Sequence, residues 1–110
     1  MDERVKKAIA FMATHLDQPP SNPTLARLAK LSESYFNFLF RSETKLSPGN
    51  YLMRLRMQKA AELLTESQLS VKQVMSKVGF HDKSNFVRSF KKEYGRSPSD
   101  YRSLGAGSRK

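Results

Sequence analysis

The sequence predicts an all-α domain of about seven helices, with two helix-turn-helix units joined by a long central helix. Three observations predict this fold. Apolar residues recur at helical spacing along most of the chain, and Ser or Asp residues of the capping type precede the repeating stretches. No strand pattern interrupts them. A chain of 110 residues can bury roughly two-thirds of its unfolded surface. We therefore expect one domain over residues 1–104.

The first helix is expected over residues 2–16, where acidic side chains in the first turn complement the helix dipole. Pro19 and Pro20 follow and are expected to end it. Ser21 caps a second, short helix that reaches about residue 29, because Pro23 suits a first turn. Its side chains expected to face inward are Leu25, Leu28 and Ala29.

A third helix is expected over residues 33–44 after the cap Ser32, which completes a first helix-turn-helix unit at about 21–44. Ser47 and Pro48 form the cap and first turn of the central helix, at about 48–65 and roughly 27 Å long. The apolar stripe of the central helix is Tyr51, Leu52, Leu55, Ala60, Leu63 and Leu64.

The second helix-turn-helix unit is expected at about 70–94, with Ser70 and Asp82 as its two caps. Phe86 and Phe90 stand four places apart and predict the buried face of its second helix. A last short helix is expected to start after Ser97 and run through Tyr101. Residues 105–110 contain no large apolar side chain, so we expect a disordered tail.

The two units repeat one pattern at a spacing of 50 residues. The matched pairs are Ser34 and Ser84, Phe36 and Phe86, Phe40 and Phe90, Arg41 and Lys91, Glu43 and Glu93, Ser47 and Ser97, Pro48 and Pro98, and Tyr51 and Tyr101. A helical hairpin duplicated only for packing is one explanation. Two DNA-recognition units about one helical turn of DNA (~34 Å) apart are the other, and polar donors on both exposed faces favour it.

Charge and composition narrow the class of partner. The formal net charge is +10, from 20 Lys and Arg against 10 Asp and Glu. A protein with such an excess of positive charge most often binds the phosphate backbone of a nucleic acid. The alternative is that the basic residues only form a solvated surface without a specific partner. The absence of Cys and two distant His predict no metal site and no cofactor. No catalytic grouping is visible, so we expect no enzyme. No bilayer-spanning run or secretory signal is visible, and we expect a cytoplasmic location without membrane association.

The second half also carries a motif that resembles a known family. Its residues are Gly79, Phe80, Asp82, Ser84, Phe86, Arg88, Phe90, Lys91, Lys92, Gly95, Ser97, Pro98, Tyr101 and Arg102. In these positions the chain resembles the DNA-binding domain of AraC/XylS-type bacterial transcription regulators. The first half matches more loosely, and the resemblance covers about residues 5–102.

The resemblance implies that the third and sixth helices enter successive major grooves of asymmetric sites near promoters. The positions that would face bases are Ser34, Asn37, Phe38, Lys83, Ser84, Asn85 and Arg88. The positions that would contact phosphates are Arg41, Lys91, Lys92 and Arg96. The chemistry fits, since Arg can bond guanine O6 and N7 and Asn can bond adenine N6 and N7. Phosphate contacts fix orientation without carrying sequence information.

Three departures from the family pattern bear on the two units. Phe38 stands where the family commonly has Arg, so it either touches a thymine methyl group or is partly buried. Lys30 and Lys45 stand where the second unit has Gly79 and Gly95. If those turns need a positive φ, Lys costs stability there and the first unit is expected to be the looser one. Conversely, Met75 in the second unit replaces the small Ala26, which should alter helix crossing.

The resulting hypothesis is a sequence-specific double-stranded DNA-binding domain of a transcription regulator, located at the bacterial nucleoid. The alternative is a basic protein that binds nucleic acid without sequence preference. The resemblance also implies contact with RNA polymerase, and a separate effector-binding or dimerisation domain. The chain would then be either a fragment of a longer protein or a minimal stand-alone regulator.

Overall fold

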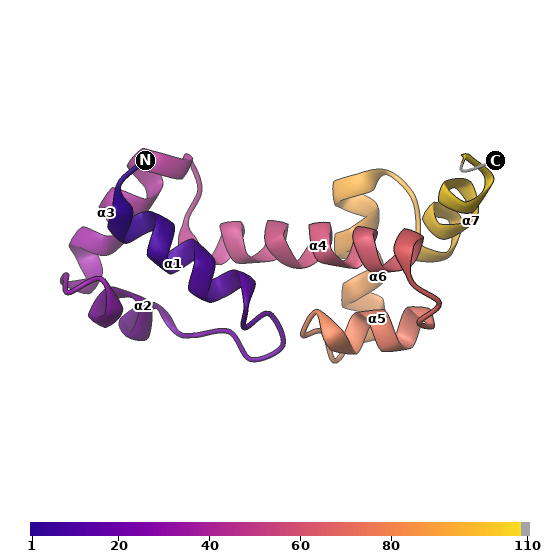
Figure 1. Cartoon of the computed structure of the whole chain (residues 1–110), viewed down its shortest axis with the longest axis horizontal. Helices are drawn as coiled ribbons and strands as arrows, with labels where there is room; N and C mark the ends of the chain where they lie inside the picture. The colour runs from indigo at the N-terminus through magenta and orange to yellow at the C-terminus, as the bar shows by residue number, and fades with distance from the viewer. Residues whose placement is uncertain (109–110) are drawn as a thin grey trace. The chain divides into compact units, whose positions relative to one another are not determined.

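The computed structural model describes residues 1–108, which form seven α-helices and no strand (Figure 1). The helices are α1 (Glu3–Ala13), α2 (Asn22–Leu28), α3 (Glu33–Thr44), α4 (Pro48–Glu66), α5 (Val71–Lys77), α6 (Lys83–Tyr94) and α7 (Pro98–Ser108). The all-α prediction is therefore confirmed. The chain forms two compact units, unit 1 from Met1 to Leu55 and unit 2 from Arg56 onward.

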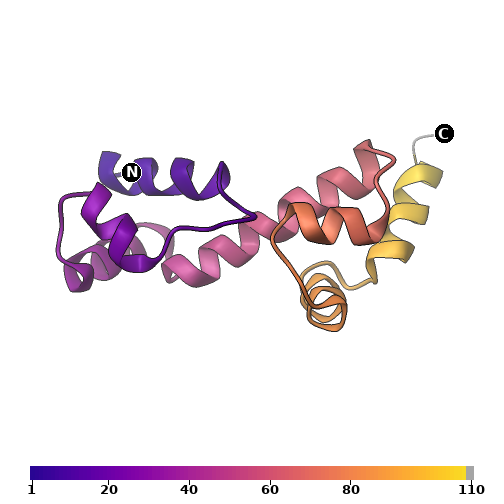
Figure 2. The same ribbon diagram turned by 90° about the horizontal axis from the view of Figure 1, so that it is seen from below.

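Unit 1 is built on the phenylalanines of α3. Phe36 and Phe40 are fully buried, and their rings contact each other at 5.7 Å between centroids. Tyr51 of α4 meets the edge of Phe40 at 5.4 Å. Helices α1, α2 and α3, whose ribbons lie next to one another in Figure 2, contribute the buried side chains of this core. The remaining buried members of the cluster are Val5, Ala8, Met12, Leu25, Ala26 and Ala29.

Unit 2 repeats this arrangement around α6. Phe86 and Phe90 are fully buried, and Tyr101 of α7 meets Phe90 at 5.3 Å as Tyr51 meets Phe40. The repeat also includes a helix that the sequence analysis left out of it. The buried residues of α1 match those of the second half of α4 at a spacing of 52, in the pairs Val5 and Met57, Ala8 and Ala60, and Met12 and Leu64. The first three helical segments of each unit thus share one buried pattern, and a fourth segment contributes the tyrosine.

The predicted caps are present. Ser21, Ser32 and Ser70 each accept a hydrogen bond from a backbone N–H in the first turn, and so does Asp82. These bonds satisfy donors that the start of a helix leaves unpaired. Ser70 also forms a full capping box, since its backbone N–H donates a hydrogen bond to the Gln73 Oε1 atom at 2.8 Å.

The first helix is shorter than predicted and ends at Ala13. Thr14 donates through Oγ1 to the Phe11 carbonyl at 3.1 Å, and His15 Nδ1 lies 2.8 Å from the same oxygen atom. These side chains satisfy the carbonyl that the next backbone N–H of a continued helix would have used. The helix therefore ends before the proline pair at 19–20.

Two predictions about inward-facing residues need correction. Leu28 was expected inside but is 46% exposed, because the buried side of α2 is centred between Leu25 and Ala26 and position 28 falls outside that arc. On the central helix, Met57 and Ala61 belong to the buried stripe although the sequence analysis omitted them.

The tail prediction is also wrong for residues 105–108, which continue α7. A Cβ added to Gly105 would lie 2.6 Å from the Cγ2 atom of Thr65, so the bare glycine backbone packs closely on α4. The prediction of a disordered tail considered only apolar side chains and therefore missed this contact of a glycine backbone. The Arg102 Nε group also donates to the Leu64 carbonyl at 2.9 Å, which ties α7 to the end of α4. Residues 109 and 110, the rest of the predicted tail, lie outside the described residues.

Within residues 1–108, four turn residues have a positive φ. Lys30 and Lys45 have φ values of 59° and 69°, and Gly79 and Gly95 have 90° and 76°. Lys30 and Lys45 therefore place backbone strain in unit 1. A residue with a side chain costs about 1–2 kcal/mol in the left-handed region, and glycine avoids this cost. We still expect amides of unit 1 to exchange hydrogen faster than those of unit 2.

We expect Lys45→Gly to raise the free energy of unfolding by about 1 kcal/mol, measured by urea denaturation. The matched control is Gly95→Ala at the equivalent turn of unit 2. No atom lies within 4 Å of the added Cβ, so this substitution changes only the backbone preference and should lower stability by a similar amount. No change in either variant would contradict the strain argument.

Among the described residues, no helix has both the length and the apolar character needed to cross a bilayer.

Candidate nucleic-acid interface

Helix α6 separates an apolar face from a polar one. Phe86 and Phe90 have no exposed surface, whereas Lys83, Ser84 and Asn85 are exposed at the start of the helix. Arg88 is exposed one turn further along. Asp82 fixes the first turn by accepting from the Ser84 N–H at 3.0 Å. The apolar face of α6 therefore packs against the core, and its polar face exposes hydrogen-bond donors.

Cationic side chains follow at the end of the same helix. Lys91 and Lys92 occupy its last turn and Arg96 lies just beyond the left-handed Gly95; all three cations are exposed. Lysine and arginine near a helix C-terminus interact favourably with the helix dipole. They also suit phosphate oxygens, which need no particular base sequence.

Helix α3 has the same burial pattern with different chemistry. Ser34 and Arg41 are exposed as predicted. Asn37 is only half-exposed, because it stands on the flank of the buried face like Val87 in unit 2. Its Oδ1 atom accepts a hydrogen bond from Asn22 Nδ2 at 3.4 Å. For Asn37 to contact an adenine, its hydrogen bond with Asn22 must break and be replaced by hydrogen bonds to the base.

The structure excludes burial of Phe38 in the core, whereas its contact with a thymine methyl group stays a prediction. Its side chain is 65% exposed and so is not part of the core. Tyr35 of the same helix is itself 46% exposed and stacks on Phe38 with 6.2 Å between ring centroids. Unit 1 therefore presents two aromatic rings on the outer face of α3.

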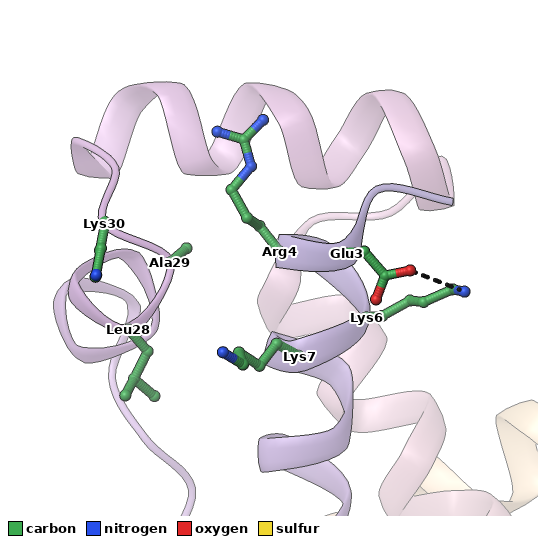
Figure 3. A pocket seen from close by; sticks show the side chains of 7 residues that line it. All are labelled: Glu3, Arg4, Lys6, Lys7, Leu28, Ala29 and Lys30. Atoms are coloured by element: carbon green, nitrogen blue, oxygen red, sulfur yellow. Dashed lines mark hydrogen bonds and ion pairs between the residues drawn. The ribbon is translucent and has the colours of Figure 1, made fainter.

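Unit 1 also contains a cationic pocket that the sequence analysis did not identify (Figure 3). It has a volume of about 690 Å³ and lies between α1 and the end of α2, with Arg4 and Lys7 on one side and Leu28 and Lys30 on the other. Its members are distant in the sequence, so no local pattern predicts it. Its chemistry favours anions, since Lys7 and Lys30 have no acidic partner among the described residues.

Arg56 differs from the exposed cations. It belongs to α4 but is half-buried, and its guanidinium lies 5.6 Å from the centroid of the Phe80 ring. Burial lowers the pKa of Arg56 from its usual value, because desolvation disfavours the charged form. This residue therefore supports the core of unit 2 through a cation–π contact.

Comparison with known proteins identifies relatives that match most of this chain. A model described as a helix-turn-helix domain matches residues 25–103. An HTH-type transcriptional regulator of Haemophilus influenzae is 36% identical over 104 residues, which are 92% of this chain and 34% of that protein. The regulatory protein SoxS of Escherichia coli is 29% identical over 89% of this chain and 92% of its own length.

Solved structures show the same fold. The DNA-binding domain of the global transcriptional factor AdpA, solved in complex with a target DNA, superimposes with a TM-score of 0.88 at 30% identity and covers 96% of both chains. An AraC-type regulator from Chromobacterium violaceum superimposes with a TM-score of 0.89 at 22% identity over 94% of this chain and 93% of its own.

The chain spans only 34%, 37% and 28% of the lengths of three of the curated relatives that it matches. The chain therefore belongs to the AraC/XylS-type helix-turn-helix family of transcription regulators.

Proposed function

We propose that this domain binds double-stranded DNA sequence-specifically, with α3 and α6 as recognition helices in successive major grooves. The main support is α6, which buries Phe86 and Phe90 completely while Arg88 and its polar neighbours remain exposed. An α-helix held in this way fits the major groove, where each base pair presents a distinct set of donors and acceptors. The DNA complex of the related AdpA domain supports the same partner.

The site residues have two proposed roles. Lys83, Ser84, Asn85 and Arg88 on α6, and Ser34, Asn37 and Phe38 on α3, contact bases. Arg41, Lys91, Lys92 and Arg96 contact phosphates and set the orientation of the domain. The half-exposed position of Asn37 limits how far its amide reaches, so we expect it to contribute less than Arg88.

Selection from random duplexes with the purified chain tests the proposal. We expect one enriched site, bound at least ~10³-fold more tightly than unrelated DNA at the same salt concentration. Footprinting on that site should show two protected segments about one helical turn (roughly 10 base pairs) apart. Failure to enrich any site would favour the alternative, a basic protein that binds nucleic acid non-specifically through its net charge of +10.

Lys91→Ala tests the phosphate role. We expect it to weaken binding to all sequences about equally and to reduce the slope of log affinity against log salt by about one, because one counterion fewer is released. The measurement is a fluorescence anisotropy titration at several salt concentrations. Lys72→Ala, an exposed lysine of α5 outside the proposed contacts, is the control. An unchanged slope in Lys91→Ala would remove this residue from the interface.

The longer relatives suggest further partners. We propose that the domain acts within a protein that also has an effector-binding or dimerisation domain, and that it contacts RNA polymerase at promoters in the nucleoid. The support is family membership together with the small share of the longer relatives that the chain spans. Co-purification of the full-length protein with RNA polymerase on promoter DNA would test the second contact.

A further inference from the structure

The recognition helices of the two units differ at two equivalent exposed positions. Tyr35 and Phe38 of α3 correspond to Asn85 and Arg88 of α6 at the repeat spacing of 50. All four residues are exposed and lie three apart on their helices, which puts each pair on one face. Unit 2 thus presents a hydrogen-bonding pair where unit 1 presents an aromatic pair.

The aromatic pair is an ordered surface. The Tyr35 and Phe38 rings stack with an interplanar angle of 25°, and Phe38 has the largest exposed fraction of the large apolar residues that the structure describes. Both rings project from a helix that is anchored on its opposite face by the fully buried Phe36 and Phe40. Leaving such apolar area in water is unfavourable, so contact with an apolar group would stabilise a complex.

The major groove offers one common apolar feature, the C5-methyl group of thymine. A phenylalanine has no donor or acceptor, so it cannot distinguish bases by hydrogen bonds. It can distinguish thymine from cytosine or uracil by contact with the methyl group. The guanidinium at the equivalent place in unit 2 suits guanine instead.

On the basis of the proposed function, we infer that α3 recognises thymine methyl groups through Phe38, which Tyr35 positions by stacking. The two halves of the DNA site then differ in chemistry. In the half bound by unit 1, methyl contact adds to the polar contacts of Ser34 and Asn37. In the half bound by unit 2, the equivalent position contributes hydrogen bonds from Arg88 to guanine. This asymmetry fixes the direction in which the domain lies on the DNA.

Single-atom changes in the DNA test the inference. After selection, each thymine of the enriched site is replaced in turn by deoxyuridine, which lacks the methyl group but keeps the base pair. We expect about fourfold weaker binding for each methyl group that Phe38 contacts, the effect of losing one buried carbon (~0.8 kcal/mol). These positions should cluster in one half of the site. Binding unchanged by every deoxyuridine would overturn the inference.

Protein variants complete the test. In Phe38→Ala the deoxyuridine effect should disappear at the same positions, whereas the preference for bases in the other half should remain. Phe38→Arg should change the preferred base from thymine to guanine in a new selection. The same selected site for wild type and Phe38→Ala would also overturn the inference, because Phe38 would then not determine base preference. Because Phe38 is exposed, thermal unfolding should confirm that both variants remain folded.

The outcomes also separate this inference from the proposed function. Selection of a preferred site that is insensitive to methyl groups overturns only the role of Phe38. Selection of no preferred site overturns both.

Discussion

Phe90→Ala is expected to lower the free energy of unfolding by about 3–5 kcal/mol, the usual cost of removing a buried aromatic ring. Phe90 is fully buried and contacts Tyr94 at 4.8 Å and Tyr101 at 5.3 Å between ring centroids. Its loss leaves a cavity where α6 meets α7. Urea denaturation measures the change, and the loss is large compared with the ~5–15 kcal/mol that holds a typical domain together.

Phe38→Ala is the matched control, since it makes the same chemical change at an exposed position of α3. Its stability should lie within about 0.5 kcal/mol of the wild type. Hydrogen exchange adds a second measurement. The two units have separate buried clusters, so Phe90→Ala should lower protection in α5 and α6 more than in α2 and α3. A loss below about 1 kcal/mol would contradict the central position of Phe90 in the core.

Arg88→Ala is expected to remove discrimination at one base position by about 1–3 kcal/mol, or roughly 5–150-fold. The reason is the loss of a guanidinium that can bond guanine O6 and N7 together. Competition binding with each of the four base pairs at every position of the selected site measures the effect. The stability of the fold should not change, because Arg88 is exposed.

Arg88→Lys is the control that separates charge from geometry. It keeps the positive charge but replaces the planar fork by a point charge, so general affinity should be retained while the preference for guanine weakens. If Arg88→Ala leaves both affinity and base preference unchanged, α6 is not a recognition helix of the kind proposed.

The secondary structure could be predicted from local patterns. Ser21, Ser32, Ser70 and Asp82 were identified as caps because their chemistry acts within one helical turn. The buried positions of α3 and α6 followed from phenylalanines four places apart. The predicted helix ends were wrong at two places. In one, a contact joins segments that are distant in the sequence, and in the other, side chains bond to backbone carbonyls at the end of the helix. Thr14 and His15 ended α1 early, and Gly105 extended α7 by packing against Thr65.

The sequence by itself determined the seven helices, the repeat and the family, since periodicity, caps and a motif are all local in the chain. Only the tertiary structure decided which flanking side chains are exposed. Phe38 and Leu28 are apolar yet lie outside the core, whereas Arg56 is charged yet lies over Phe80. The physical reason is that burial depends on which neighbouring helix covers a residue. The same dependence brought Arg4, Lys7 and Lys30 to one pocket, although α1 and the end of α2 share no local pattern.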